Sequence, residues 1–287
     1  MKKIFGFIVL GLIFLIGACD EVPPAIDFTI PLTDTSYVES TLPTKQQKNV
    51  LIEEFSGVTC VNCPSGNAFV EELVDRYDGR VITATLHAGS FATPLNISNE
   101  DFEIAETAQI DATLGVVGYP AAAVDRIQFS GDGIPMNSPY SNWEAATEEQ
   151  LKKSTPVNIE LTSEYDAKEN YLKVRTKMTY TEDIQDNHNL SIYLLESKII
   201  DPQLSVDAPG GLIKDYEHNH VVRDMLTSSS GVPVHSSSIV EGLTIIKEYE
   251  INLSVNWNVD NCELVAFVHK TGTDKEIIQS VKNKIGG

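Results

Sequence analysis

The chain has 287 residues and a formal net charge of −20, because 41 Asp and Glu outnumber 21 Lys and Arg. A chain of this length usually forms more than one domain, each large enough to bury its own core. The strong negative charge excludes binding to nucleic acid or to anionic lipid surfaces as a main role.

The first residues have the features of a bacterial secretion signal. Two lysines precede an apolar run over residues 4–16, which is short for a membrane span. Residues 16–19, Ile-Gly-Ala-Cys, resemble the lipobox of bacterial lipoproteins, in which the cysteine is acylated and becomes the first residue of the mature chain. We therefore predict a signal peptide over residues 1–18 and a palmitate-type anchor in the bilayer on Cys19. An ordinary cleaved signal, or an uncleaved anchor with an incidental cysteine, is the alternative.

The residues that follow Cys19 indicate where the protein is located in the cell envelope and how it is connected to its anchor. Asp20 and Glu21 resemble the acidic export tag of surface lipoproteins in Bacteroidetes-type bacteria, whereas in enterobacteria an aspartate at this position resembles an inner-membrane retention signal. The membrane face therefore stays open. Residues 19–48 are rich in Pro, Thr and Ser, a composition that predicts a flexible tether.

Residues 49–154 predict alternating strands and helices. Short apolar runs indicate buried strands, and apolar residues at helical spacing indicate helices. This order predicts a small α/β sheet domain. The expected strands cover residues 49–55, 81–87 and 121–126, with a fourth at 127–129 after a bend, and the expected helices cover residues 60–77, 100–114 and 143–151.

From residue 155 to 287 the apolar residues recur with a period of two. Such alternation predicts antiparallel strands, which we expect to form an immunoglobulin-like β-sandwich. A long insertion, residues 196–242, separates these strands, and segments of that length usually hold some structure or a function. The alternating stretches are residues 157–161, 172–178, 190–194, 245–253 and 264–268.

The strongest local motif is Thr-Cys-Val-Asn-Cys-Pro over residues 59–64, between a predicted strand and a predicted helix. It resembles the thioredoxin-like redox motif. At a helix N-terminus the free N–H groups and the helix dipole stabilise a thiolate, so Cys60 is the expected attacking sulfur. Cys63 lies within disulfide reach and is the expected resolving thiol. Pro64 fits the first helical turn without loss of a hydrogen bond.

Two further positions match the thioredoxin-like pattern. Gly118-Tyr119-Pro120 precedes the third strand, where thioredoxin-like proteins carry a cis-proline that faces the disulfide. The resemblance implies that Gly118 and Tyr119 offer their backbone to a substrate peptide. Glu54 lies six residues before Cys60, where thioredoxins have a buried aspartate that assists proton transfer.

Other features of the motif leave its role open. No tryptophan precedes Cys60, and the Val61-Asn62 pair matches neither reducing thioredoxins nor strong oxidants, so the redox direction is not fixed. A Cys60–Cys63 disulfide that only staples a loop is an equal alternative to exchange. Metal binding is a weaker one, because a single Cys-x-x-Cys is two ligands short of a zinc site.

Four other residues have side chains that could act as reactive groups or metal ligands. We expect Cys262 to be a buried strand cysteine, with intermolecular pairing as the alternative. His218 and His220 are candidate metal ligands, but no third ligand is evident, and hydrogen-bonded loop packing is the favoured interpretation. His87 ends the second strand and receives no role. We expect no cofactor or metal.

Several segments together resemble the Bacteroidetes outer-membrane lipoprotein family that is Omp28-related. These segments are residues 50–64, 118–120, 218–226 and 265–268. The resemblance implies an outer-membrane lipoprotein with a thioredoxin-like domain followed by an all-β domain. It implies no agreed reaction.

Two functions follow as hypotheses. In the first, the protein exchanges thiols and disulfides on extracytoplasmic proteins, with Cys60, Cys63, Glu54 and Pro120 in the active site. In the second, it is a non-catalytic binding or adhesion lipoprotein whose disulfide is structural and whose β-domain insertion makes the contact.

Overall fold

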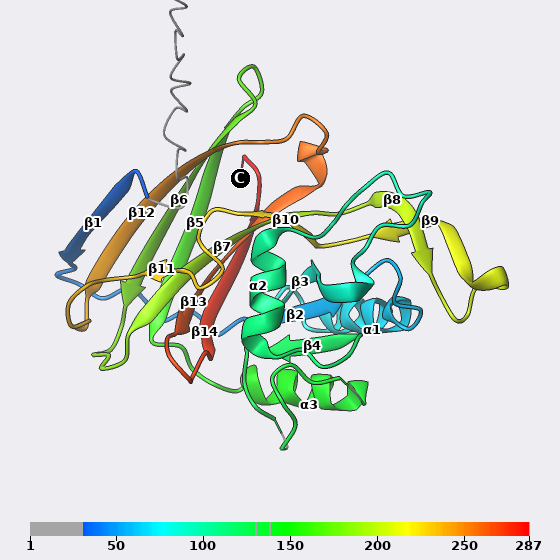
Figure 1. The fold of residues 1–287 in the computed structure, drawn as a ribbon. Coiled ribbons are helices and arrows are strands. Elements are labelled where there is room, and N and C mark those ends of the chain that lie inside the picture. Colours follow the sequence, from blue (N-terminus) through cyan, green and yellow to red (C-terminus); the bar gives the residue numbers. More distant parts are fainter. Residues whose placement is uncertain (1–30, 130, 138, 287) are drawn as a thin grey trace, which may run out of the picture.

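The computed structural model describes residues 31–286 except 130 and 138 (Figure 1). The predicted signal peptide, the Cys19 anchor and the first part of the predicted tether lie outside the described residues. Within the described range, the helices are too short or too polar to pass through a membrane.

The protein is mostly β, with two large sheets and a small hairpin (Figure 1). One sheet has four antiparallel strands in the order β1-β12-β6-β5, and the other has eight strands, β14-β13-β7-β10-β3-β2-β4 with β11 beside β7. The strands of the first sheet are β1 (Thr33–Val38), β5 (Val157–Asp166), β6 (Tyr171–Tyr180) and β12 (Leu243–Asn252). Those of the second are β2 (Val50–Ser56), β3 (Val81–His87), β4 (Ala121–Val124), β7 (His188–Glu196), β10 (Val221–Met225), β11 (Val232–Pro233), β13 (Cys262–Lys270) and β14 (Ile277–Lys284), and the hairpin is β8 (Ile199–Leu204) with β9 (Leu212–His218).

Strand β10 joins the parts of the chain that were predicted as separate domains. It comes from the predicted insertion and pairs in parallel with β3 at Val221 and Thr85. On its other edge it pairs antiparallel with β7. The strands of the α/β part therefore continue directly into those of the C-terminal part.

The helices agree with the predicted pattern but start at different residues. They are α1 (Cys63–Arg76), α2 (Ala105–Leu114) and α3 (Tyr140–Gln150). The predicted start of the first helix at residue 60 is wrong, because Asn62 is its N-cap and residues 57–61 form turns. Helix α2 starts later than residue 100 because the Thr107 hydroxyl accepts a hydrogen bond from the Ile104 N–H and fixes the first turn there.

The strand predictions hold for β2 to β7, β12 and β13. The predicted insertion, for which no strand bounds were given, forms β8 to β11, and there are three further differences. The expected strand at residues 127–129 is absent, because Asp125 and Arg126 have φ of 44° and 53° and end β4 at Val124. Part of the predicted tether is strand β1, which pairs with β12. Strand β14 was not predicted, because its apolar start is followed by polar residues.

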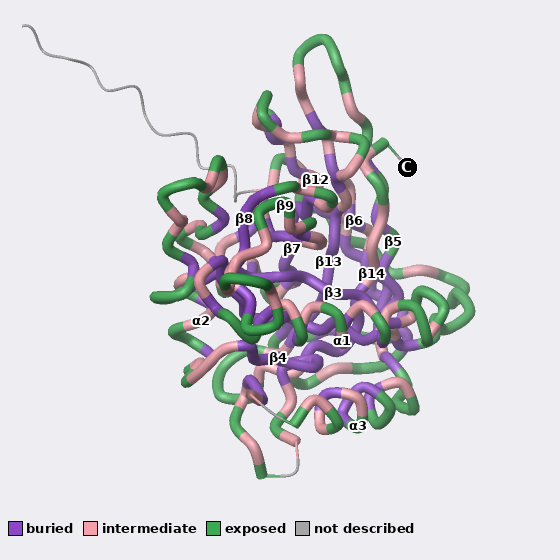
Figure 2. The backbone as a smooth tube through the Cα atoms, turned by 90° about the vertical axis from the view of Figure 1, so that its right-hand side faces the viewer, coloured by how far each residue is buried: buried purple, intermediate pink, exposed green. Residues whose placement is uncertain are grey.

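The eight-stranded sheet carries apolar layers on both faces. Alternate residues of β2 and β7 point to opposite faces, as the period of a strand requires. One face packs on α1 and α3 and, further along, on the four-stranded sheet, while the other packs on α2. Figure 2 shows the central strands buried and the outer helix faces exposed.

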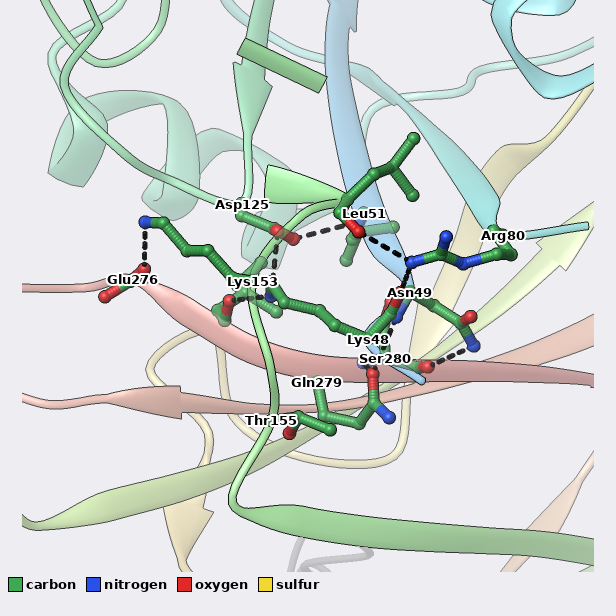
Figure 3. Close-up of polar contacts among 12 residues, drawn as sticks. Lys48, Asn49, Leu51, Arg80, Asp125, Lys153, Thr155, Glu276, Gln279 and Ser280 are labelled. Carbon is green, nitrogen blue, oxygen red and sulfur yellow. Dashed lines mark hydrogen bonds and ion pairs between the residues drawn. The ribbon is translucent and has the colours of Figure 1, made fainter. Parts of the chain in front are cut away.

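A buried polar junction ties the start of β2 to β14 (Figure 3). Lys48 Nζ lies 2.9 Å from Asp125 Oδ2 and donates to the Ile277 carbonyl at 2.8 Å. The Asn49 side chain donates to the Ser280 carbonyl at 3.0 Å. Because Lys48 is only 2% exposed, this ion pair is shielded from solvent and fixes the two chain segments together.

Candidate functional site

Cys60 and Cys63 form a disulfide at the start of α1. Cys60 lies in a turn just before the helix, where its N–H donates to the Gly57 carbonyl at 3.0 Å. Cys63 is the first helical residue and donates to the Cys60 carbonyl at 3.2 Å. Pro64 lies in the first turn as predicted.

The loop before the disulfide packs tightly on the segment after β3. A Cβ added at Gly57 would lie 2.3 Å from the Phe91 carbonyl oxygen, so only glycine fits there. The Thr59 N–H donates to the same oxygen at 3.0 Å. These contacts fix the backbone that leads into Cys60.

Glu54 and Pro120 meet α1 one turn beyond the disulfide. The Tyr119–Pro120 peptide bond is cis. A Cβ at Gly66 would lie 2.9 Å from Pro120 Cβ and 3.1 Å from Glu54 Oε1. The absence of a side chain at Gly66 therefore lets both residues approach the helix.

Asn67 connects Glu54 with the second cysteine. Oriented so that its nitrogen faces the two acceptors, its side-chain amide donates to Glu54 Oε1 and to the Cys63 carbonyl, both at 2.7 Å. The carboxyl group thus lies below the first turn of α1, in a hydrogen-bonded path to the backbone of Cys63.

Glu54 is a buried carboxyl group without a cationic partner. Among the described residues it makes no ion pair, whereas the adjacent Glu53 accepts from Arg126 Nε at 2.6 Å and from the Tyr193 hydroxyl at 2.6 Å. Burial and, to a smaller degree, the charge of Glu71 raise the pKa of Glu54 well above its usual value. Its environment therefore favours the protonated form of the Glu54 carboxyl in the oxidised protein.

A groove runs beside the disulfide along the residues predicted to bind substrate. It has a volume of about 480 Å³ and its lining includes Asn62, Ser65, Val117 and Tyr140 together with residues 118–120. Within it, the Gly118 carbonyl accepts a hydrogen bond from the side chain of Asn137. The Tyr119 hydroxyl donates to Asp111, and burial with this hydrogen bond raises the pKa of Tyr119.

The predicted insertion covers the disulfide loop. The N–H groups of Leu204 and Val206 donate to the carbonyls of Val58 and Val61, both at 2.9 Å. Gln203 Nε2 donates to the Cys60 carbonyl at 3.0 Å. Cys60 is accordingly only 2% exposed and Cys63 only 1%.

The remaining candidates lie elsewhere. His218 packs against Phe102 and Tyr216, while His220 pairs with Glu71 and Glu263, so the two histidines do not converge on one point. In the described part of the chain, no group of three His, Cys, Asp or Glu side chains could hold a metal ion.

Cys262 and His87 are both buried. Cys262 is 2% exposed, and burial followed by the charge of Glu196 raises the pKa of its thiol to about 12. His87 lies at the end of β3 against Phe102 and His218, and neither of its ring nitrogens has a hydrogen-bond partner in the described structure.

Three residues of this site were not predicted. Gly66 carried a signal, since a glycine inside a helix often marks close packing. Asn67 and Gln203 carried none, because their roles depend on which segments meet in space.

Comparison with known proteins gives a family and a fold. The family model described as outer membrane protein Omp28 matches residues 107–287. The structure of HBP35 of Porphyromonas gingivalis aligns at 20% identity with a TM-score of 0.64, covering 83% of this chain and 76% of that one. A protein of Agrobacterium tumefaciens aligns at 13% identity with a TM-score of 0.52, covering 85% and 97%.

A third solved structure aligns only weakly with this chain. A domain of the outer membrane lipoprotein Omp28 from Porphyromonas gingivalis has 22% identity and a TM-score of 0.30, covering 46% of this chain and 89% of that one. No curated protein matches the chain.

Proposed function

The chain belongs to the outer membrane protein Omp28 family, and on this premise we propose that it exchanges thiols and disulfides with extracytoplasmic proteins at the outer membrane. One observation carries the proposal. Glu54 is a buried carboxyl group, without an ion-pair partner among the described residues, below the first turn of a helix that starts with a disulfide cysteine. Such a group costs stability, and strongly perturbed buried acids concentrate at functional sites.

The steps of the exchange balance on this chain's own residues. A substrate thiolate attacks Cys60 Sγ, the bond to Cys63 Sγ breaks, and a mixed disulfide forms. Cys63 leaves as a thiolate and takes the proton of Glu54. A second substrate thiolate then releases Cys60, so the substrate loses two electrons and the cysteine pair gains them. The reverse sequence reduces a substrate disulfide.

The proposal also covers the domain organisation of the protein and its membrane anchor. We propose that residues 49–154 are a thioredoxin-like unit and residues 155–287 an immunoglobulin-like unit. The order β2-α1-β3-α2-β4-α3 and the antiparallel layer packed on β7 and β13 support this division. Cys19, acylated after removal of residues 1–18, would anchor the chain in the bilayer.

A second function is favoured by the burial of both cysteines. Cys60 and Cys63 are 2% and 1% exposed, as expected of a disulfide that only staples the loop of a binding or adhesion protein. In that case the exposed surface, including the insertion, would contact the partner.

One experiment separates the two functions. Insulin reduction and refolding of a scrambled-disulfide substrate are measured for the wild type, for Cys60→Ser and for Cys262→Ala as the matched control. Exchange predicts loss of activity only in Cys60→Ser. Equal rates in all three proteins would indicate that the disulfide only cross-links the loop and takes no part in exchange.

A further inference from the structure

A cavity separate from the substrate groove reaches Glu54. It has a volume of about 190 Å³ and shares no lining residue with the groove. Its polar lining includes Glu54 and Asn67 from the site, Glu71 from α1, Thr85 from β3, and Tyr216 and Asn219 from the insertion. The buried carboxyl group is thus in contact with a polar space that the exchange steps do not use.

The turn between β9 and β10 forms one wall of this cavity. Thr85 is the register partner of Glu54 in the neighbouring strand. The Thr85 N–H donates to the His220 carbonyl at 2.7 Å, and its hydroxyl donates to the Asn219 carbonyl at 3.1 Å. These bonds hold the turn beside the strand position of Glu54.

His220 brings a positive charge next to Glu71, which lines the cavity. Its Nε2 lies 3.4 Å from Glu71 Oε1 and its Nδ1 lies 3.0 Å from Glu263 Oε1. Burial lowers the pKa of His220, but hydrogen bonds to Glu263 and Glu71 outweigh it and raise the pKa to about 9. His220 is therefore protonated at neutral pH.

Glu71 gives this group of charges access to solvent. Its side chain is 41% exposed, whereas that of His220 is 16% exposed. Glu71 lies on the helix that carries Asn67, and it lines the same cavity as Glu54.

We propose that Glu71, which lines the same cavity as Glu54, and His220, which pairs with Glu71, form the proton relay between solvent and Glu54. The relay deepens the proposed function, because Glu54 must recover the proton that it gives to Cys63. The positive charge of His220 favours the Glu54 carboxylate, and the negative charge of Glu71 disfavours it. His220 acts here as a positioning residue.

Other groups also face this cluster. Glu263 from β13 pairs with His220, and Lys282 from β14 lies 3.7 Å from Glu263. Tyr216 and Glu217 from β9 line the cavity. The net effect on Glu54 is therefore best tested by changing one charge at a time.

The test measures the titration of the Glu54 carboxyl directly, by NMR of the oxidised protein with ¹³C-labelled glutamate, assigned with Glu54→Gln. In His220→Asn the midpoint should move up by about half a pH unit or more, and in Glu71→Gln it should move down by a similar amount. Asparagine tolerates the positive φ of 54° at this position. His220→Lys, which keeps the charge, should titrate like the wild type, as should the remote control His235→Gln.

Unchanged midpoints, or shifts in the same direction for His220→Asn and Glu71→Gln, would overturn the relay. This titration needs no substrate, so it can fail while Cys60→Ser still abolishes exchange. If exchange holds, the pH optimum of insulin reduction should follow the same opposite shifts. If Cys60→Ser exchanges at the wild-type rate, the proposed function fails and the relay with it, whatever the titrations show.

Discussion

The side-chain amide of Gln203 donates to the main-chain oxygen of Cys60 at 3.0 Å, from a strand more than 140 residues further along the chain. The same nitrogen donates to the Gly57 carbonyl at 3.2 Å. The hairpin of β8 and β9 therefore holds the disulfide loop in place through these hydrogen bonds. Because Cys60 is only 2% exposed, we expect a thiolate to reach its Sγ only when this contact opens.

Gln203→Ala should open the loop more often. It removes the donor of two buried carbonyl groups, and a loss of about 1 kcal/mol or more corresponds to about five-fold more of the open form. The alkylation rate of Cys60 in the gently reduced protein should rise accordingly. Gln279→Ala, which removes a buried glutamine at the β14 junction, is the control and should leave this rate unchanged. Equal rates in both variants would show that the hairpin does not limit access.

Gly66→Ala should destabilise the protein although alanine is the better helix former. In an open helix the change would stabilise by about 1 kcal/mol. Here the new methyl group would lie 2.9 Å from Pro120 Cβ and 3.1 Å from Glu54 Oε1, and such overpacking costs about 1–3 kcal/mol. Urea unfolding measures the difference, with Ser65→Ala on the exposed side of α1 as control. A more stable Gly66→Ala would contradict this packing.

The sequence predicted the elements of this site better than their assembly. The apolar runs of β2 and β3 and the Cys-x-x-Cys motif are local signals, and each appears where expected. The start of α1 was misplaced because Asn62, not the first cysteine, is the N-cap. Local pattern does not decide between adjacent capping positions.

The contacts that the insertion makes with the site could not be predicted. Gln203 and His220 lie in the insertion, and their contacts depend on β10 pairing with β3. A single parallel register pair carries no periodic signal in the sequence. Strand β1 was not predicted for the same reason. It lies in a segment whose composition is that of a tether, and it is a strand because it pairs with β12.

The buried pair of Glu53 and Arg126 should be a major determinant of stability. Arg126→Met would leave the Glu53 carboxylate buried beside Tyr193 without a cation, at a cost of about 3–5 kcal/mol. The double variant Glu53→Gln with Arg126→Met should recover part of that loss. Denaturant unfolding of the set measures the coupling. Additive losses in the double variant would contradict a direct pairing.

Cys262 should stay unreactive in the folded protein. Its burial and a thiol pKa of about 12 keep it protonated, and thiolate is the reactive form. After gentle reduction, an alkylating reagent should label Cys60 first and Cys262 only on unfolding, as mass spectrometry of peptides would show. Labelling of native Cys262, or a disulfide-linked dimer lost in Cys262→Ala, would favour intermolecular pairing instead.

Acid should weaken the fold because several histidines are buried in the neutral form. Burial lowers the pKa of His87 well below its usual value and that of His218 to about 4. Their stabilising contribution is complete above an unfolded pKa of about 6.5 and declines toward pH 4, because the unfolded chain binds protons that the folded one excludes. Each such histidine adds a slope of about 1.4 kcal/mol per pH unit in that window. His87→Phe keeps an aromatic ring against Phe102 and should flatten the fall of Tm between pH 6.5 and 4. The control His235→Phe should not flatten it. An unchanged slope in His87→Phe would show that His87 does not titrate in this range.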